Sequence, residues 1–294
     1  MEMFSSWYLP TLLSAVGLGF YNICNKHAVK DNSVMPTLFC ATLCGTAFFV
    51  LLTACRGELA SVLTFAPRNQ LLVALKALLV SASWICVYYA LRELPISLAS
   101  PIRSTSPLWT LIGGVLLYGE IPTHLQAVGM ALILVGYMLF SFFGSREGFS
   151  WNSRAMVLIV AGTLLGAASA LYDKYLLNVL RLDRTMLQCF FALDLVVFLG
   201  AAWAARSCFG RKRRFVWKWS IPVTGVLLIL SDLSYFYALG IPSAPISMIS
   251  MLRRCSCVVT FFVGAKVFHD RNLKRKTVAL AVLVAGAVLL ALAK

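Results

Sequence analysis

Ten long apolar runs, separated by short polar breaks, constrain the fold of this chain more than any other feature of its sequence. A membrane-spanning helix needs about 20 mostly apolar residues to cross a hydrocarbon core about 30 Å thick. Of the 294 residues, 60% are hydrophobic and 13% are charged, whereas a soluble domain is roughly one-quarter charged. The runs lie at 5–25, 35–55, 70–91, 96–118, 123–143, 155–175, 185–205, 219–239, 243–266 and 275–292. The sequence therefore predicts an all-α integral membrane protein with ten transmembrane helices.

The second half of the chain repeats the first. Residues 83–91 (SWICVYYAL) align with residues 231–239 (SDLSYFYAL) at an offset of 148. Two inserted residues then shift the offset to 150, at which residues 95–97 and 245–247 both read Pro-Ile-Ser. Each copy holds five predicted helices, and because five is odd, the second copy enters the membrane from the opposite side.

This symmetry predicts two inverted five-helix repeats, in residues 1–146 and 151–294. Many secondary transporters bind their substrate near the bilayer midplane, at the interface between such repeats. The alternative is a gene duplication that only produces a stable helix bundle. Inverted symmetry favours transport, because it supplies two near-equivalent conformations for alternating access.

Two motifs in the first copy resemble those of a known family. Residues 118–120 (Tyr-Gly-Glu) end the fourth predicted helix, and glycines 129 and 136 lie in the fifth. Together with the two five-helix halves, they resemble the EamA domain of the drug/metabolite transporter superfamily over essentially the whole chain. The second copy departs from the family pattern, with His-Asp at 269–270 in place of Gly-Glu and alanine at 279 in place of the first glycine. The resemblance implies a ten-helix carrier of small organic solutes.

Three arginines fall near the middle of predicted helices. Arg103 lies about eight residues into the fourth run, and Arg253 and Arg254 lie about ten residues into the ninth. An arginine at the membrane centre costs about 2.5 to 3.5 kcal/mol on insertion scales, so each should face a partner or a hydrated cavity. A guanidinium suits carboxylate or phosphate, which it binds through paired hydrogen bonds. These residues therefore predict an anion site, with close packing through neighbouring small residues as the alternative.

The two adjacent arginines of the ninth run add a point of similarity to the same superfamily. Arg253 and Arg254 are similar to the basic pair that some phosphate-metabolite exchangers of the same superfamily carry in their ninth helix. Arg103 corresponds to Arg253 at the repeat offset of 150. We therefore expect all three arginines to contact the substrate.

Other charged residues at membrane depth are candidates for supporting roles. Asp232 and Asp194 could neutralise an arginine, or take and release a coupling proton. For Asp232, a purely structural ion pair with one of the three arginines is an equally good interpretation. Lys26 and Lys174, related by the repeat, lie near helix ends and either contact the substrate or extend to the interface.

Aromatic residues supply candidates for the organic part of a substrate. Trp84 lies in the third predicted helix, and Tyr89 and Tyr237 occupy repeat-related positions in the third and eighth. Aromatic residues in membrane helices also serve in helix packing, and this is the alternative interpretation for all three.

Positive charge in the breaks predicts the orientation. The chain carries 26 Lys and Arg against 11 Asp and Glu, a formal net charge of +15. When Lys76, Arg103, Arg253 and Arg254 are left aside as intramembrane residues, 22 Lys and Arg remain, and 16 of them lie in or directly beside the breaks that follow the odd-numbered helices. Positive residues concentrate on the cytoplasmic side. Both termini are therefore expected on the non-cytoplasmic side, in a bacterial inner (plasma) membrane.

Together these features predict a secondary-active transporter of a small organic solute, anionic or zwitterionic, such as a phosphorylated metabolite, a carboxylate or an amino acid. The sequence has no Gly-x4-Gly-Lys-Ser/Thr loop, so we expect a coupling proton or a counter-substrate to supply the energy. No cofactor, metal or nucleic-acid partner is predicted. Two alternatives remain: an integral-membrane lipid-headgroup enzyme, and a transporter of organic cations with Asp232 or Asp194 as the receptor.

Overall fold

The computed structural model describes residues 7–30, 32–58, 65–94, 99, 102–143, 153–209, 215–268 and 273–292. Within these ranges every regular element is helical. The first half contains α1 (Tyr8–Val29), α2 (Val34–Cys55), α4 (Pro67–Glu93), α6 (Ser106–Tyr118) and α7 (His124–Phe143). The second half contains α8 (Ser153–Lys174) with the π-helical turn η2 (Tyr175–Val179), α9 (Arg184–Phe209), α10 (Ser220–Leu239), α11 (Ile246–Leu252), the 3-10 turn η3 (Arg253–Cys255), α12 (Ser256–Phe268) and α13 (Leu273–Leu292).

The all-helical prediction is confirmed for these residues, and the helices follow the predicted apolar runs in order. In the described part of the chain, six segments are long and apolar enough to cross a membrane: Val34–Cys55, Pro67–Leu91, Arg154–Val179, Arg184–Ser207, Ser220–Leu239 and Ile246–Val263. Shorter apolar helices cover His124–Leu139 and Thr277–Leu292.

The fourth and ninth runs are less regular than predicted. Arg103 does not lie inside α6 but in a short helical turn, residues 102–104, that precedes it. The reason is Pro107, which cannot donate a backbone hydrogen bond to the carbonyl of Arg103, so the helix starts again at Ser106. In the ninth run the backbone tightens into η3 at Arg253, which separates α11 from α12.

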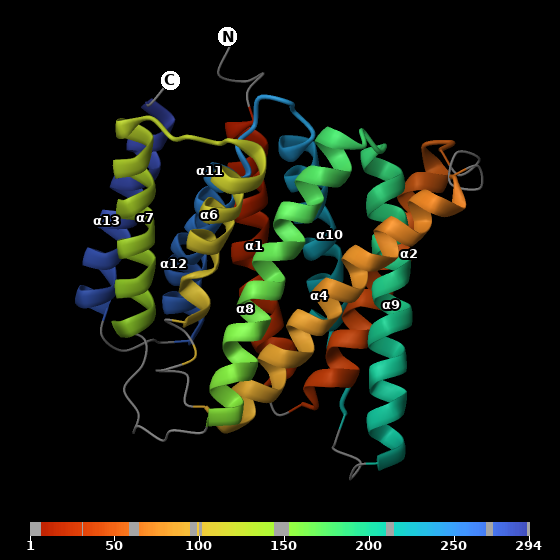
Figure 1. Ribbon diagram of the computed structural model, residues 1–294. Helices are drawn as coiled ribbons and strands as arrows, with labels where there is room; N and C mark the ends of the chain where they lie inside the picture. Colours follow the sequence, from red (N-terminus) through yellow and green to blue (C-terminus); the bar gives the residue numbers. More distant parts are fainter. Residues whose placement is uncertain are drawn as a thin grey trace.

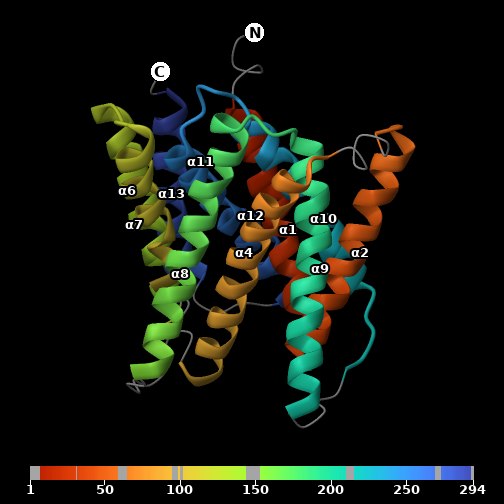
Figure 2. The same ribbon diagram turned by 45° about the vertical axis from the view of Figure 1, so that its right-hand side comes forward.

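The helices form one bundle with two distinct edges (Figures 1 and 2). Helices α7 and α13 lie side by side at one edge, and α2 and α9 lie at the other. Between them, α1 packs against α10 and α12, and α4 packs against α8. We call the end of the bundle where α1 begins and α13 ends the terminal end, and the end where α4 ends and α6 begins the distal end (Figure 1).

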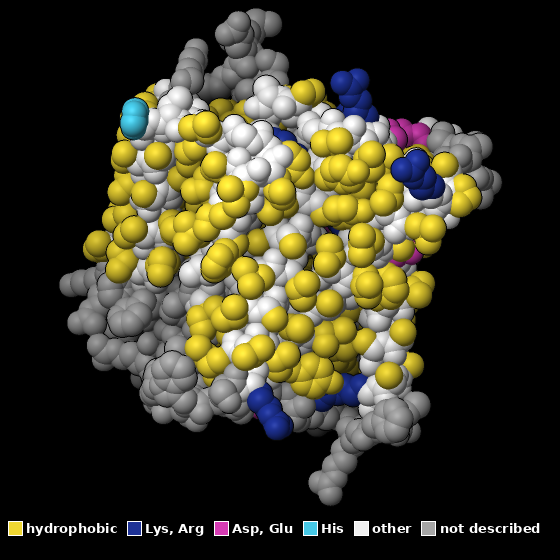
Figure 3. All heavy atoms as spheres, in the orientation of Figure 1, with side chains coloured by type: hydrophobic (Ala, Val, Ile, Leu, Met, Phe, Trp, Pro, Cys, Tyr) yellow, Lys and Arg dark blue, Asp and Glu magenta, His cyan; other side chains and the backbone are white. Residues whose placement is uncertain are grey.

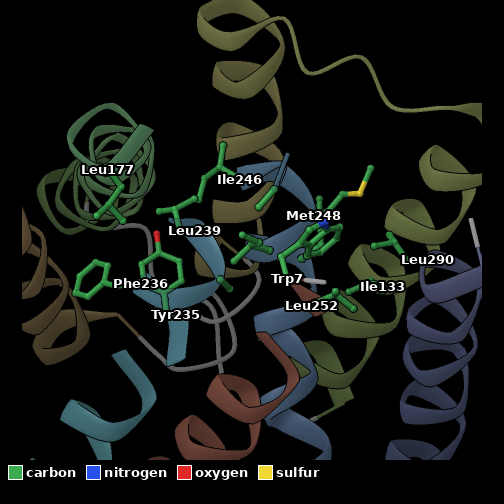
Figure 4. Packing of buried hydrophobic residues seen from close by; sticks show 14 of the residues in the cluster. Trp7, Ile133, Leu177, Tyr235, Phe236, Leu239, Ile246, Met248, Leu252 and Leu290 are labelled. Carbon is green, nitrogen blue, oxygen red and sulfur yellow. The ribbon is translucent and has the colours of Figure 1, made fainter. Parts of the chain in front are cut away.

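The terminal end contains a dense apolar core (Figure 4). Trp7, Leu177, Leu239, Ile246 and Leu290, from both halves of the chain, belong to one buried cluster and are at most 8% exposed. The face of the molecule seen in Figure 3 is mostly apolar between the two ends, and the Lys and Arg side chains visible on it lie toward the ends. This distribution fits a bundle surrounded by lipid, with charged side chains at the two interfaces.

Candidate functional site

A cavity of about 610 Å³ lies inside the bundle. Its lining comes from both halves of the chain, including α1, α4 and α6 of the first half and α8, α10 and η3 of the second. Sites for small molecules usually have volumes of about 300 to 1,000 Å³. The cavity is therefore large enough for a small organic solute.

The cavity is accessible at the distal end and closed at the terminal end, as judged from the residues that the structure describes. At the distal end, Arg103 and Asn22 are exposed, and Leu91 is 40% exposed. Toward the terminal end, Lys76 and Asp173 are 2% and 4% exposed.

Arg253 has two partners in the cavity. Its Nη2 donates a hydrogen bond of 3.0 Å to Oδ1 of Asp232. Its guanidinium carbon also lies 4.1 Å from the centroid of the Tyr235 ring, a cation–π contact. Because Asp232 and Arg253 lie on different helical segments, this pair joins α10 to η3. The sequence allowed Asp232 to pair with any of three arginines, and in the structure its partner is Arg253.

Arg103 and Arg254 line the same cavity without a carboxylate partner among the described residues. The Arg254 guanidinium carbon lies 5.6 Å from the centroid of the Tyr137 ring. The Nε atoms of Arg253 and Arg254 are buried and have no hydrogen-bond partner within the described residues. Buried donors usually find an acceptor, so these guanidinium groups have unused capacity to bind an anion.

Sequence reasoning missed the deepest charged group of the cavity. Lys76 of α4 forms a buried ion pair with Asp173 of α8, and its ammonium lies 4.1 and 4.2 Å from the ring centroids of Phe191 and Phe236. The Tyr235 hydroxyl donates a 3.2 Å hydrogen bond to the other oxygen of Asp173. A single lysine inside an apolar run is itself a signal of function, and it could have directed attention to this position.

The structure separates the predicted site residues into two groups. Arg103, Arg253, Arg254, Asp232 and Trp84 line the cavity. The other predicted residues do not line it: Lys26, Lys174, Tyr89, Tyr237 and Asp194.

Helix rotation explains where the two predicted tyrosines lie. Tyr89 is five positions beyond Trp84 on α4, and Tyr237 is five beyond Asp232 on α10, which turns each side chain by about 140° from the cavity face. Tyr89 is 38% exposed and Tyr237 is 54% exposed. Tyr237 instead contacts Arg184, whose guanidinium carbon lies 4.7 Å from its ring centroid.

Lys174 belongs to a network that closes the terminal end. It forms an ion pair with Glu120, which follows α6, and donates a 3.2 Å hydrogen bond to the carbonyl of Ala244. Glu120 also accepts hydrogen bonds from the backbone N–H groups of Ile246 and Ser247 and from the Ser247 hydroxyl, at 2.7, 3.1 and 2.7 Å. Burial alone would raise the pKa of the Glu120 carboxyl, but the hydrogen bonds from Lys174, Ser247 and Ile246 outweigh it and hold this pKa below its usual value.

The remaining two predicted residues lie elsewhere. Asp194 is a half-buried residue of α9, and its Oδ2 atom has no hydrogen-bond partner among the described residues. Lys26 lies exposed in the last turn of α1. The charged residues of the described cavity lining are therefore the three arginines, Lys76 and the carboxylates of Asp173 and Asp232.

Comparisons with known proteins agree with the helical architecture. Residues 5–142 match the model of the EamA-like transporter family. Among solved structures, 28 chains match. One of them, a crystal structure of a protein, covers 96% of this chain and 94% of its own, with a TM-score of 0.70 and 17% sequence identity. At this identity the likeness shows a shared fold over nearly the whole length. No curated protein matches the chain significantly.

Proposed function

Because its match to the EamA-like family places this protein in the drug/metabolite transporter superfamily, we propose that it is a secondary-active transporter of a small organic anion. The solute would bind in the central cavity, between two inverted five-helix repeats, and alternating access would expose it to one side of the membrane at a time. The observation that carries the proposal is the convergence of Arg103 from the first half with Arg253 and Arg254 from the second on one cavity.

Repeat-related hydrogen bonds support the inverted symmetry. The Ser83 hydroxyl of α4 donates to the carbonyl of Gly162 in α8 at 2.6 Å, and the Ser231 hydroxyl of α10 donates to the carbonyl of Ser14 in α1 at 2.8 Å. At the offset of 148, position 83 becomes 231 and position 14 becomes 162. One bond is therefore the symmetry mate of the other, as expected for halves in residues 1–146 and 151–294.

The contacts between helices show the same correspondence between the two halves. The contact of α1 with α10 corresponds to that of α8 with α4, and the contact of α2 with α10 corresponds to that of α9 with α4. Between α7 and α13, a Cβ atom added at Gly136 would come within 2.9 Å of the Ala279 carbonyl, and one added at Gly286 within 2.7 Å of the Gly129 carbonyl. The repeat offset of 150 relates the two contacts to each other, because Gly136 corresponds to Gly286 and Gly129 corresponds to Ala279. Close packing through small residues is typical of membrane helices.

The charge of the cavity favours an anion over the other solutes. Its described lining contains four cations and two carboxylates: Lys76, Arg103, Arg253, Arg254, Asp173 and Asp232. Both carboxylates are already paired, with Lys76 and Arg253. An organic cation would therefore meet a site with an excess of positive charge, and a zwitterion would bring an ammonium group into it. A phosphorylated metabolite or a carboxylate fits this field best.

The alternative of a lipid-headgroup enzyme is less well supported. Members of the matched family are transporters, which fits a protein without catalytic activity. The paired carboxylates of the cavity are bound to cations, so they offer no free pair for acid–base chemistry. We therefore retain transport as the proposal.

The orientation follows from the charge distribution of the sequence. The odd-numbered predicted helices correspond to α1, α4, α7, α9 and α12, which end toward the distal end, and the breaks that follow them in the sequence carry most of the Lys and Arg outside the spans. We propose that this end faces the cytoplasm of a bacterial inner membrane, and that the structure has its cavity accessible from that side. Energy would come from a coupling proton or from exchange with a counter-substrate.

Transport into proteoliposomes tests this function. We expect Arg253→Gln to lower uptake of a radiolabelled phosphorylated or carboxylated solute by about tenfold or more, because hydrogen bonds to a charged group contribute about 1.5 to 3 kcal/mol. Arg184→Gln is the matched control, since Arg184 contacts Tyr237 outside the cavity. Unlabelled anions should compete and quaternary amines should not. Unchanged uptake by a folded Arg253→Gln protein, or competition by cations alone, would contradict the proposal.

A further inference from the structure

Two ion pairs join described residues of the cavity, Arg253–Asp232 and Lys76–Asp173. Of these, Arg253–Asp232 is the one that a solute can reach. Its side chains are 20% and 17% exposed, whereas those of Lys76 and Asp173 are 3% and 6% exposed. Arg253 is also the arginine that already has an anionic partner. An anion that binds Arg253 must therefore either share this guanidinium with Asp232 or replace Asp232 on it.

Arg253 would keep its position if Asp232 left it. The ring of Tyr235 lies under the guanidinium at 4.1 Å, and the Tyr235 hydroxyl is itself hydrogen-bonded to Asp173. This contact holds the arginine from a side that Asp232 does not occupy. The guanidinium is thus prearranged to accept a different anion without a large movement of the backbone.

Asp232 would be left in an unfavourable state. A partly buried carboxylate that loses its cation carries an unpaired charge in a medium of lower dielectric constant than water, which favours the neutral acid. The incoming anion would add a second negative charge nearby and strengthen the same tendency. Asp173 differs, because Lys76 and Tyr235 would still hold its two oxygens after an anion had bound at Arg253.

We propose that a solute anion replaces Asp232 on Arg253, and that the Asp232 carboxylate then takes one proton from water in the cavity. The exchange breaks the ion pair between Arg253 and Asp232, forms one between Arg253 and the solute, and converts the carboxylate to a neutral carboxylic acid. Anion and proton therefore bind together and leave together, which makes the carrier an anion–proton cotransporter. This inference rests on the proposed function and specifies its coupling ion.

The surroundings of Asp232 contain few groups that could take this proton instead. The charged and titratable groups that face it are Tyr21 of α1, Lys76 of α4, Asp173 of α8, Tyr235 of its own helix and Arg253 of η3. From α2 and α9, Thr42, Thr46 and Gln188 share a small pocket with Asp232, and none of the three titrates. Lys76 and Arg253 are the basic partners of the two ion pairs, so Asp232 and Asp173 are the carboxylates of this region that can take the proton.

Calorimetric binding of sulfate to the purified full-length protein tests the inference. Sulfate is a suitable probe because its charge does not change between about pH 5 and about pH 8, so any proton taken up must bind the protein. Titrations in buffers of different ionisation enthalpy measure the protons taken up per anion. We expect about one proton per sulfate and an affinity that falls by about tenfold for each pH unit increase where the coupling operates.

Three variants assign the proton to its site. Asp232→Asn should bind sulfate without proton uptake and with an affinity that no longer depends on pH in this range. Asp232→Glu keeps a carboxyl group and should restore both effects. Asp194→Asn is the matched control, because Asp194 does not line the cavity, and it should take up protons as the wild type does.

The outcomes separate the two proposals. Sulfate binding without proton uptake, or proton uptake that persists in Asp232→Asn, overturns the coupling and leaves an anion carrier. If the wild-type protein binds no sulfate at any pH, the anion site itself is wrong, and both proposals fail.

Discussion

The carboxylate of Glu120 accepts a hydrogen bond of 2.7 Å from the backbone N–H of Ile246, so a side chain of the first half caps the first turn of α11 in the second. The first N–H groups of a helix have no partner within it, and a carboxylate there also interacts favourably with the helix dipole. Glu120 binds Lys174 of α8 as well. One side chain therefore joins three segments at the closed end of the cavity.

Replacing Glu120 should weaken this closure. We expect Glu120→Gln to lower the free energy of unfolding by about 1 to 3 kcal/mol, because it removes charge-assisted hydrogen bonds and leaves Lys174 without its anion. Thermal unfolding of the detergent-purified protein measures the loss. Glu58→Gln is the matched control, since Glu58 forms no ion pair with any described residue. Equal unfolding temperatures for Glu120→Gln and the wild type would contradict this role.

Acid should remove the stabilisation that the Glu120 carboxylate provides. The pKa of Glu120 in the folded protein lies below its ordinary value of 4.5, so the unfolded chain binds this proton more readily than the folded one. The stabilisation is therefore complete above about pH 4.5 and is lost as the pH falls through the folded pKa. The difference in unfolding temperature between wild type and Glu120→Gln should be constant from about pH 7 to about pH 5 and should shrink below that. A difference that grew on acidification would reverse the sign of the inferred shift.

The buried pair of Lys76 and Asp173 should show strong coupling. Removing one partner leaves an uncompensated buried charge, which costs about 3 to 5 kcal/mol. We expect Lys76→Met and Asp173→Asn each to destabilise the protein strongly, and the double variant to be much more stable than the sum of the two losses implies. A double-mutant cycle of unfolding free energies measures this coupling, and additive effects would show that the pair contributes little.

A reporter fused after Lys294 tests the proposed orientation. Since 16 of the 22 Lys and Arg that remain without Lys76, Arg103, Arg253 and Arg254 lie in or beside breaks after odd-numbered helices, the C-terminus should face away from the cytoplasm. A fused alkaline phosphatase should be active and a fused green fluorescent protein dark. The opposite pattern would place the cavity opening of this structure on the other side of the membrane.

Much of the helical architecture could be predicted without coordinates. The second apolar run was expected at 35–55, and the helix covers Val34–Cys55. The reason is physical: a membrane segment must be apolar over its full length and must satisfy its backbone hydrogen bonds internally. The same cost of burying charge in lipid drew attention to Arg103, Arg253 and Arg254, and all three line the cavity.

What the sequence could not decide is which side chains meet. It allowed Asp232 to pair with any of three arginines, and only the placement of α10 relative to η3 in the tertiary structure selected Arg253. It treated Lys174 as a candidate substrate contact, whereas the tertiary structure binds it to Glu120. It favoured Tyr89 and Tyr237, which helix rotation turns away from the cavity. Hydrophobicity and repeat symmetry are properties of the chain itself, but contacts between residues far apart in sequence depend on how helices rotate and pack, and these are decided only in three dimensions.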